Sequence, residues 1–253
     1  AGCVDMPEWD VSLVTDMSQL FRDKSQFNAD ISAWDTSQVT DMGYMFYGAA
    51  VFNGAVGTWD TSQVTDMWSM FRDAAAFDQA IGSWDTSQVE NMNAMFMDAA
   101  AFNQPIGSWN TSQVKNTAHM FRDATSFNQA IGAWDTSQVT DMQYMFIRAT
   151  SFNQDISSWS TSKVTDMNNM FKGAAAFYQD ITGWTTTSLI YSTDMFTDAG
   201  AWLNRLERDG TTSTDGPSNV WVHKPCLVNE RVQSGWCVPC GGGGIRPAGD
   251  DPS

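Results

Sequence analysis

Residues 34–58 read WDTSQVTDMGYMFYGAAVFNGAVGT, and this 25-residue pattern recurs along most of the chain. Tryptophan begins each copy, with no insertion between copies, at Trp9, Trp34, Trp59, Trp84, Trp109, Trp134, Trp159 and Trp184. Phenylalanine, methionine and isoleucine or valine recur at fixed distances after it, so each residue type forms columns through the repeats. A fixed period of this length is the signature of a repeat protein, in which each unit packs only against its neighbours.

The order of residues within one unit predicts a short strand followed by a short helix. Val39 lies in a stretch rich in Thr and Ser, which is typical of a strand. Met42, Met45, Phe46 and Ala49 then follow with the i, i+3, i+4, i+7 spacing of one helical face. Stacking of such units would align the apolar columns into one core, with parallel strands about 4.8 Å apart and a rod roughly 40 Å long. We therefore predict an α/β repeat solenoid with a short parallel strand plus a short helix per 25-residue unit.

This organisation divides the chain into three parts. Residues 1–8 are an N-terminal lead-in, residues 9–208 hold eight repeats, and residues 209–253 form a linker and a tail rich in Cys and Gly. The formal net charge of −16 argues against nucleic acid as a partner, because phosphates would be repelled. No apolar run approaches the roughly 18 residues of a membrane span.

Catalysis is not expected from this sequence. The two histidines, His119 and His223, lie far apart, and no phosphate-binding loop, nucleophile elbow or metal triad is present. The many carboxylates sit at repeated turn positions, without the paired, desolvated setting of catalytic acids. We expect no catalytic and no cofactor-binding residues.

One acidic column has two interpretations. Seven residues after each Trp from Trp9 to Trp159 stand Asp16, Asp41, Asp66, Asn91, Asn116, Asp141 and Asp166. A ladder of carboxylates would bind calcium, whereas single residues just before a helix would be N-caps. Asn caps as well as Asp but weakens a cation site, so we favour caps and keep calcium as the alternative.

The other polar columns are interpreted as structural. The Asp, Asn, Ser or Thr directly after each Trp predicts a tight turn closed by its own side chain. Asn residues after the second Phe column predict an amide ladder that satisfies backbone groups. The Thr-Ser columns predict a hydroxyl ladder within the stack, with ice binding or O-linked glycosylation as alternatives. Asn110 begins the sequence Asn-Thr-Ser and is a candidate for N-glycosylation.

The positions that vary most between units predict an interaction surface. Variation at nine, ten and thirteen residues after Trp brings aromatic and apolar residues to what should be the outer face. An outward row of such side chains along a rod is a plausible partner surface. The candidates are Tyr44, Tyr47, Trp68, Met97, His119, Tyr144 and Ile147.

All four cysteines lie outside the repeats, and their even number suggests disulfides in an oxidising compartment. The candidates are Cys3, Cys226, Cys237 and Cys240. Either the tail folds back to Cys3, or Cys3 pairs with the tail of the next molecule and links copies head to tail. A zinc site that adds His223 to the three tail cysteines is the remaining alternative.

The unit W-D-T-S-x-V-T-D-M-x-x-M-F-x-x-A-x-x-F-N-x-x-I resembles the BspA-like surface repeat family, a leucine-rich-repeat relative first noted in mycoplasma lipoproteins and found in algal and protist surface proteins. The resemblance covers residues 9 to about 206. It implies a leucine-rich-repeat-like solenoid that is surface-exposed or secreted, works in interaction or adhesion, and has no known active site to transfer.

Two functions fit these features. The first is an extracellular structural protein, a subunit of a surface fibre or coat assembled head to tail by homotypic contacts. The second is an adhesion or ligand-binding module of a larger cell-surface protein, with a glycan or another surface protein as its partner.

Overall fold

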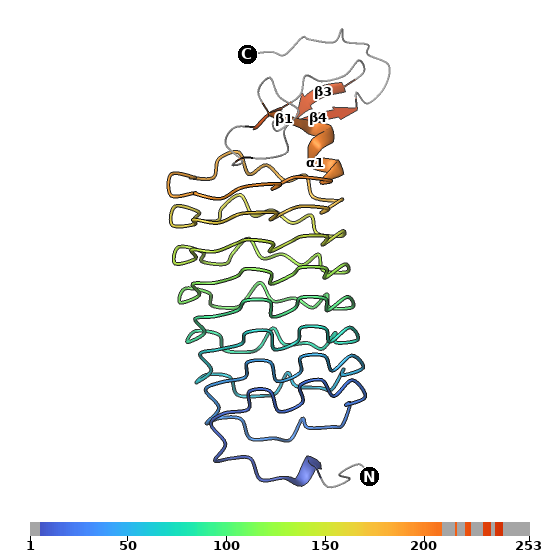
Figure 1. Cartoon of the computed structure of the whole chain (residues 1–253), viewed down its shortest axis with the longest axis vertical. Helices are drawn as coiled ribbons and strands as arrows, with labels where there is room; N and C mark the ends of the chain where they lie inside the picture. The colour runs from blue at the N-terminus through green and yellow to red at the C-terminus, as the bar shows by residue number, and fades with distance from the viewer. Residues whose placement is uncertain (1–5, 209–215, 217–220, 224–229, 234–235, 240–253) are drawn as a thin grey trace.

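The computed structural model describes residues 6–208, 216, 221–223, 230–233 and 236–239. Figure 1 shows the repeats as a stack of coils, one coil per unit, with the first coil at one end and α1 beyond the last. Within the described residues, helices and strands occur only at the two ends of this stack. They are η1 (Met6–Glu8), α1 (Gly200–Arg205), β1 (Leu206–Arg208), β2 (Trp221–His223), β3 (Glu230–Gln233) and β4 (Trp236–Pro239).

Backbone hydrogen bonds join every coil to the next one. The N–H groups of Met17, Gln19, Phe21 and Asp23 donate to carbonyl oxygens of the second coil at 2.7–2.9 Å. The same four bonds recur 25 residues further on at every junction up to the eighth coil. One parallel bridge accompanies them at each junction, beginning with the pair Asp16 and Asp41. The coils are therefore paired in parallel, but by single-residue bridges where we expected short strands.

The helix that we predicted in each unit is absent from the described coils. In an α-helix each N–H donates to the carbonyl four residues back, but here alternate N–H groups donate to the next coil. The intervening ones donate three residues back, as Met45 does to Met42 at 3.2 Å, and so close tight turns. Tyr44 and Gly48 have φ values of 58° and 68°, which is typical of the third residue of a type II turn. Consecutive turns therefore replace the helix.

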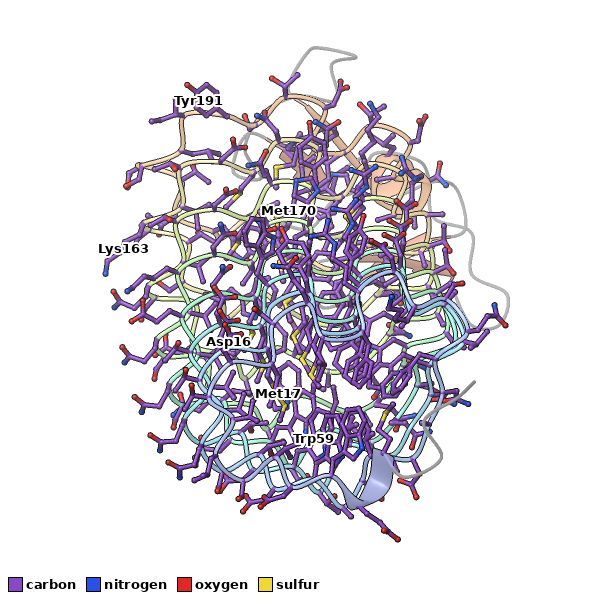
Figure 2. All side chains as sticks on the ribbon, turned by 60° about the horizontal axis from the view of Figure 1, so that its bottom comes forward. Asp16, Met17, Trp59, Lys163, Met170 and Tyr191 are labelled. Carbon is purple, nitrogen blue, oxygen red and sulfur yellow. The ribbon has the colours of Figure 1, made fainter. Side chains whose placement is uncertain are left out.

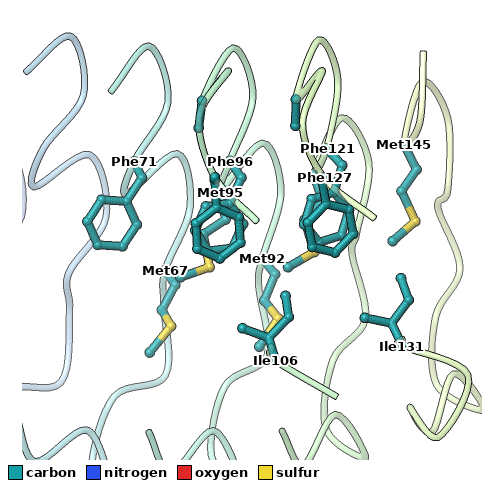
Figure 3. Close-up of a cluster of buried hydrophobic side chains, with 14 of the residues drawn as sticks. Met67, Phe71, Met92, Met95, Phe96, Ile106, Phe121, Phe127, Ile131 and Met145 are labelled. Carbon is teal, nitrogen blue, oxygen red and sulfur yellow. The ribbon is translucent and has the colours of Figure 1, made fainter. Parts of the chain in front are cut away.

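The pattern of buried positions was nevertheless predicted correctly. Met42, Met45, Phe46 and Ala49 have no exposed surface, because the turns bring residues three and four apart to the same side. Figure 3 shows methionine, phenylalanine and isoleucine side chains of successive coils lying in rows between the backbone walls. The i, i+3, i+4, i+7 spacing thus predicted the buried residues correctly, but the backbone that carries them forms turns and not a helix.

Aromatic rings stack along the whole core. Within one coil the rings of Phe46 and Phe52 lie 3.9 Å apart between centroids, and Phe46 lies 5.4 Å from Phe71 of the next coil. The indole N–H of each Trp from Trp59 to Trp184 donates to the carbonyl of the Ile or Val 28 residues earlier, at 3.1 Å for the bond from Trp59 to Ile31. Each Trp therefore fills the core and also satisfies a buried carbonyl oxygen.

The acidic column makes the hydrogen bond of a cap without a helix. Oδ1 of Asp16 accepts from the N–H of Ser18 at 2.8 Å, and Oδ1 of Asp166 accepts from the N–H of Asn168 at 2.8 Å. The N-cap interpretation was wrong about the following element, because a turn begins there. A side-chain oxygen that accepts an N–H two residues on is an Asx turn, which Asp and Asn make equally well.

Three further polar columns have the structural roles that the sequence predicted. Asp35 closes a turn by accepting from Ser37 N–H at 3.0 Å. Asn128 Oδ1 accepts the N–H of Asn153 in the next coil at 2.9 Å, and this amide ladder continues along the stack. The hydroxyl of Thr61, which is 1% exposed, donates to a carbonyl oxygen of the next coil at 2.9 Å. These columns bond coil to coil.

The described coils thus form a continuous stack with a single core. Its assignment to the leucine-rich-repeat-like α/β class stays a prediction, since the coils contain neither the helix nor the longer strand on which that class was predicted.

Candidate interaction surfaces

One lateral face of the stack carries the residues that vary most between units. The residue ten positions after each Trp has a positive φ in every unit, from Gln19 at 60° to Asp194 at 55°. Bulky side chains rarely adopt this conformation, yet Tyr44 and Tyr144 do so at 58° and 57°. The other turn position with positive φ, four residues further on, holds Asp, Gly or one Arg. The backbone conformation at these two positions is therefore intrinsically unfavourable for tyrosine.

Tyr44, Tyr47 and Trp68 form one aromatic cluster on this face. The ring centroid of Tyr44 lies 4.8 Å from Trp68 and 5.8 Å from Tyr47. The guanidinium of Arg22 lies 5.2 Å from the Tyr44 ring and 5.1 Å from the Tyr47 ring, and that of Arg72 lies 5.1 Å from the Tyr47 ring. Tyr47 therefore contacts a cation from the coil before it and another from the coil after it. We call these five residues the Trp68 cluster.

Each arginine of the Trp68 cluster is also held by polar groups of its own coil. Arg22 donates to Gln19 Oε1 at 3.0 Å and lies 3.6 Å from Asp23. Arg72 Nε lies 3.3 Å from Asp73 Oδ2. The guanidinium charges are thus compensated by neighbouring carboxylates, and their stacking on the rings fixes the ring positions.

A second aromatic pair lies further along the same face. The rings of His119 and Tyr144 are stacked, with centroids 4.7 Å apart and an angle of 10° between the ring planes. Burial lowers the pKa of His119, and the positive charge of Arg122 lowers it further. Nδ1 of His119 is buried and accepts or donates no hydrogen bond within the described residues. The stacked pair presents little of the histidine to a partner.

Two of the predicted surface residues are not on the surface. Met97 and Ile147 are only 7% and 5% exposed, so the expectation that they point outward was wrong. Arg72 and Arg122, at the same position in other units, are half-buried. This position can therefore hold either a partly exposed arginine, whose charged head stays in water, or a buried apolar side chain, whose burial is favourable.

Ion pairs occupy the middle of this face. Nε and Nη2 of Arg148 contact Oδ1 and Oδ2 of Asp123, each at 2.6 Å, and Arg122 Nε lies 3.3 Å from Oδ2 of the same carboxylate. Burial alone would raise the pKa of Asp123, but the hydrogen bonds and charges of these arginines lower it overall. Asp98 has a raised pKa, first because of burial and then because Asp123 and Asp73 are close.

The N-terminal end of the stack exposes groups that are buried in every other coil. Trp9 is 43% exposed, whereas Trp34 is 4% exposed, and Leu20 is 44% exposed where the next coil has fully buried Met45. Leu13 is 89% exposed, but its position is exposed in every coil, where the following units have Gln or another polar residue. Among the described residues, η1 covers this end in part, since Met6 packs against the core and its carbonyl accepts from the Trp34 indole N–H at 3.0 Å, while Trp9 and Leu20 stay exposed.

The same end presents a row of backbone acceptors. The carbonyl oxygens of Asp16, Ser18, Leu20 and Arg22 correspond to those that accept cross-coil bonds in all later units, and no described residue donates to them. They alternate along the chain, so they face out of the stack side by side. We call this surface, with Trp9 and Leu20, the N-terminal end face; Leu13 is a further exposed apolar side chain of the same coil.

The C-terminal end of the stack is covered. Trp202 of α1 has no exposed surface and stacks on Phe196 with centroids 4.4 Å apart. Trp221 of β2 is 4% exposed and meets the Phe196 ring edge-on at 5.1 Å. β1 and β2 pair antiparallel, as do β3 and β4. Within the described residues the two ends of the stack therefore differ: Trp9 and Leu20 are exposed at one, and tryptophan rings close the other.

Side-chain directions agree with this division between core and surface. Figure 2 shows Lys163 and Tyr191 projecting from the outside of the stack, whereas Met17 and Met170 point into its interior. Tyr191 is 55% exposed and its neighbour Ile190 is 68% exposed, so the last coil also carries apolar side chains on its outer edge.

The remaining candidate sites are placed only in part. Asn110 is exposed and its Oδ1 accepts from Ser112 N–H at 3.1 Å, at a corner of its coil. Among the described side chains, no group of three or more His, Cys, Asp or Glu residues is arranged to hold a metal ion. Cys3, Cys226 and Cys240 lie outside the described residues; so does the side chain of Cys237, although its backbone is part of β4.

The part of the chain that the structure describes contains no helix of the length and hydrophobicity required to cross a lipid bilayer.

These features define a class of protein: a repeat protein whose 25-residue coils share one continuous core. The model of a family described as "Mycoplasma protein of unknown function, DUF285" matches residues 3–108, 52–137 and 101–209 in overlapping segments. The chain belongs to this family, and the assignment made from its repeat motif is confirmed. Comparison with curated proteins found no match, and neither did comparison with solved structures.

Proposed function

We propose that the chain is an extracellular structural protein, a subunit of a surface fibre or coat that assembles through homotypic contacts and has no catalytic role. The observation that carries this proposal is the N-terminal end face. Exposed Trp9 and Leu20 lie there beside carbonyl oxygens that accept cross-coil hydrogen bonds in every other unit, and the same coil carries exposed Leu13. Unpaired backbone groups beside apolar side chains are a template for pairing with another chain.

The polarity of these backbone groups restricts how two copies can meet. A head-to-head contact would place one row of four carbonyl oxygens against another, and neither row could donate. Among the positions that bond from coil to coil elsewhere, the same end has N–H donors without a described acceptor at Thr15 and Asn28, but pairing of the row itself needs a partner surface that presents N–H groups. This favours a head-to-tail contact between different surfaces, and such heterologous contacts produce open filaments when they do not close into a ring.

The C-terminal elements offer surfaces of the required kind. Both the β1–β2 pair and the β3–β4 pair have only two strands among the described residues, so each strand has an outer edge. Two-stranded sheets are marginally stable alone and gain from a further pairing. In the proposed fibre, an outer edge at the C-terminal end of one copy donates to the N-terminal end face of the next.

Sedimentation velocity over a range of protein concentrations tests this proposal. The variant carries Leu13→Gln and Leu20→Gln, which replace the two exposed leucines with the polar residue that most later units have at the position of Leu13. The control is Val51→Gln, because Val51 is 40% exposed in the second coil, away from the end face. Wild type and control should form larger species as concentration rises, and the double variant should remain smaller at the same concentration. A wild-type chain that stays monomeric at all concentrations would contradict the proposal, as would a double variant that assembles like the wild type.

A second function, that of an adhesion or ligand-binding module, is favoured by a separate observation. The Trp68 cluster places aromatic rings on the lateral face of the rod, where Trp68 is 42% exposed. This surface does not involve either end of the stack, so the two functions are compatible and can be tested separately.

A further inference from the structure

The Trp68 cluster is a rigid aromatic surface that no packing requirement of its own coil explains. At the position of Trp68 the other units have Ser, Gly, Asn, Ala, Gln or Thr, and their coils have the same cross-coil hydrogen bonds. The indole is 42% exposed and therefore buries less apolar surface than any Trp of the core. A large aromatic side chain left in water at this one place is a candidate for ligand contact.

The geometry holds the rings ready for a ligand. Trp68 leans toward the second coil, since its ring lies 4.8 Å from that of Tyr44. The guanidinium groups of Arg22 and Arg72 flank Tyr47 at 5.1 Å on each side. Fixed side chains lose little conformational freedom on binding, which favours affinity.

Hydrogen-bonding groups that have no partner surround the exposed indole. The phenol hydroxyls of Tyr44 and Tyr47 and the indole N–H of Trp68 make no hydrogen bond with a described residue. Unpaired donors are thus available next to the exposed aromatic rings of the cluster.

The charges of the cluster argue against a polyanion. Arg22 and Arg72 each lie near an aspartate of their own coil, at 3.6 Å and 3.3 Å, and the whole chain has a net charge of −16. A phosphate or sulfate polymer would have to displace these carboxylates and approach against the overall charge.

The extent of the cluster argues against a protein partner. A stable protein interface buries about 800 Å² on each side around an apolar centre. Trp68 is the one large hydrophobic side chain strongly exposed in the described coils between Val51 and Ile190, so the lateral face lacks such a centre.

We propose that the Trp68 cluster binds a neutral polysaccharide. The C–H face of one sugar ring would lie on the Trp68 indole, and the sugar hydroxyls would accept from the tyrosine O–H and indole N–H groups. This inference is independent of the fibre proposal, because it uses different residues from the N-terminal end face.

Affinity electrophoresis in native gels tests the site. The probes are laminarin, soluble xylan and galactomannan as neutral polysaccharides, with alginate and dextran sulfate as anionic ones. The test variant is Trp68→Asn, which introduces the residue that two other units carry at this position as Asn93 and Asn168. It should leave the coil intact, and an unchanged thermal unfolding midpoint would verify this. The matched control is Val51→Gln, which replaces another exposed apolar side chain that belongs neither to the Trp68 cluster nor to the N-terminal end face.

At least one neutral polysaccharide should retard the wild-type chain, with a dissociation constant raised tenfold or more by Trp68→Asn and unchanged by Val51→Gln. Three results would overturn the proposal: no retardation by any neutral polysaccharide, retardation by the anionic ones only, or a Trp68→Asn variant that binds like the wild type. None of these results bears on fibre assembly, which is measured without polysaccharide.

Discussion

Replacement of Asn103 by alanine should destabilise the stack at one rung of its amide ladder. Oδ1 of Asn103 accepts from the N–H of Asn128 at 2.9 Å and from Nε2 of Gln129 at 3.0 Å. The side chain of Gln129 would lose only one of its two bonds, because its Nε2 also donates to the backbone carbonyl oxygen of Asn103 at 2.8 Å. The half-buried N–H of Asn128 would lose its only acceptor, and an unsatisfied buried donor costs about 1–3 kcal/mol.

We therefore expect Asn103→Ala to lower the free energy of unfolding by about 2 kcal/mol, which lowers the thermal midpoint by roughly 4–8 °C in a chain of this size. The chain itself supplies the control. Asp78 occupies the preceding rung, where its Oδ1 accepts from the N–H of Asn103 at 2.9 Å and from Gln104 Nε2 at 3.0 Å. Asn103→Asp should therefore stay within about 0.5 kcal/mol of the wild type.

Urea denaturation at pH 7, followed by tryptophan fluorescence, measures both variants against the wild type. The reasoning would be refuted if Asn103→Ala cost less than about 0.5 kcal/mol, a change typical of ordinary surface positions. It would also be refuted if Asn103→Asp cost as much as Asn103→Ala, because the ladder would then depend on the amide and not on an acceptor oxygen.

Three more changes test the coil-to-coil contacts, each by thermal denaturation. Gly107→Ala should destabilise the stack by about 1–3 kcal/mol, because the added Cβ would lie 2.4 Å from a carbonyl oxygen of the next coil. Gly183→Ala should leave the stability unchanged, because nothing lies within 4 Å of the added Cβ. Equal effects of the two substitutions would be inconsistent with this packing. Trp109→Phe should cost about 2–3 kcal/mol, since it removes a 3.0 Å bond to a buried carbonyl and leaves a cavity. Trp9→Phe should cost much less, because the Trp9 indole N–H has no described partner, and a similar loss for both would show that the indole bond is unimportant. Asp98→Asn should stabilise the chain at pH 7, because burial and nearby carboxylates raise the pKa of Asp98 and make its charged form unfavourable. This gain in stability should disappear as the pH falls to about 3, where the carboxyl group is mostly protonated in the unfolded chain as well. A gain that does not depend on pH would contradict this cause.

The core could be predicted from the sequence because it depends on spacing alone. Trp, Phe, Met and Ile columns with a constant period must stack on themselves, whichever backbone carries them. The polar columns were predictable for a similar reason, since Asp, Asn and Thr have few ways to satisfy nearby backbone groups. The predicted turn after each Trp and the amide ladder are both present, as the bonds from Ser37 to Asp35 and from Asn153 to Asn128 illustrate.

The backbone could not be predicted from spacing, because two geometries bury the same positions. Met42, Met45 and Phe46 lie on one face of a helix, and they also lie on one side of two consecutive tight turns. The choice depends on whether alternate N–H groups bond within the unit or to the next one, which is a property of the stack. Gly48 and the aspartates at its position in other units were a signal for positive φ, but Tyr44, which has the same conformation, gave none.

The surface was predicted only in part, and again neighbouring coils explain the difference. Tyr44, Tyr47 and Trp68 were recognised as candidates, but the contacts of Arg22 and Arg72 with their rings depend on which residues become adjacent across coils. Whether a residue thirteen positions after Trp is exposed depends on its own chemistry, so arginine and the apolar Met97 behave differently there. Leu13 did carry a signal, because it replaces the Gln of later units.

Negative-stain electron microscopy of the purified chain at the concentrations used for sedimentation tests the central claim most directly. The proposal predicts unbranched filaments built from rods, with an axial repeat slightly longer than the roughly 40 Å that eight coils at strand spacing occupy. The Leu13→Gln, Leu20→Gln variant should give mainly single rods. Single rods of the wild type at every concentration, or filaments unaffected by the double variant, would contradict assembly through the N-terminal end face.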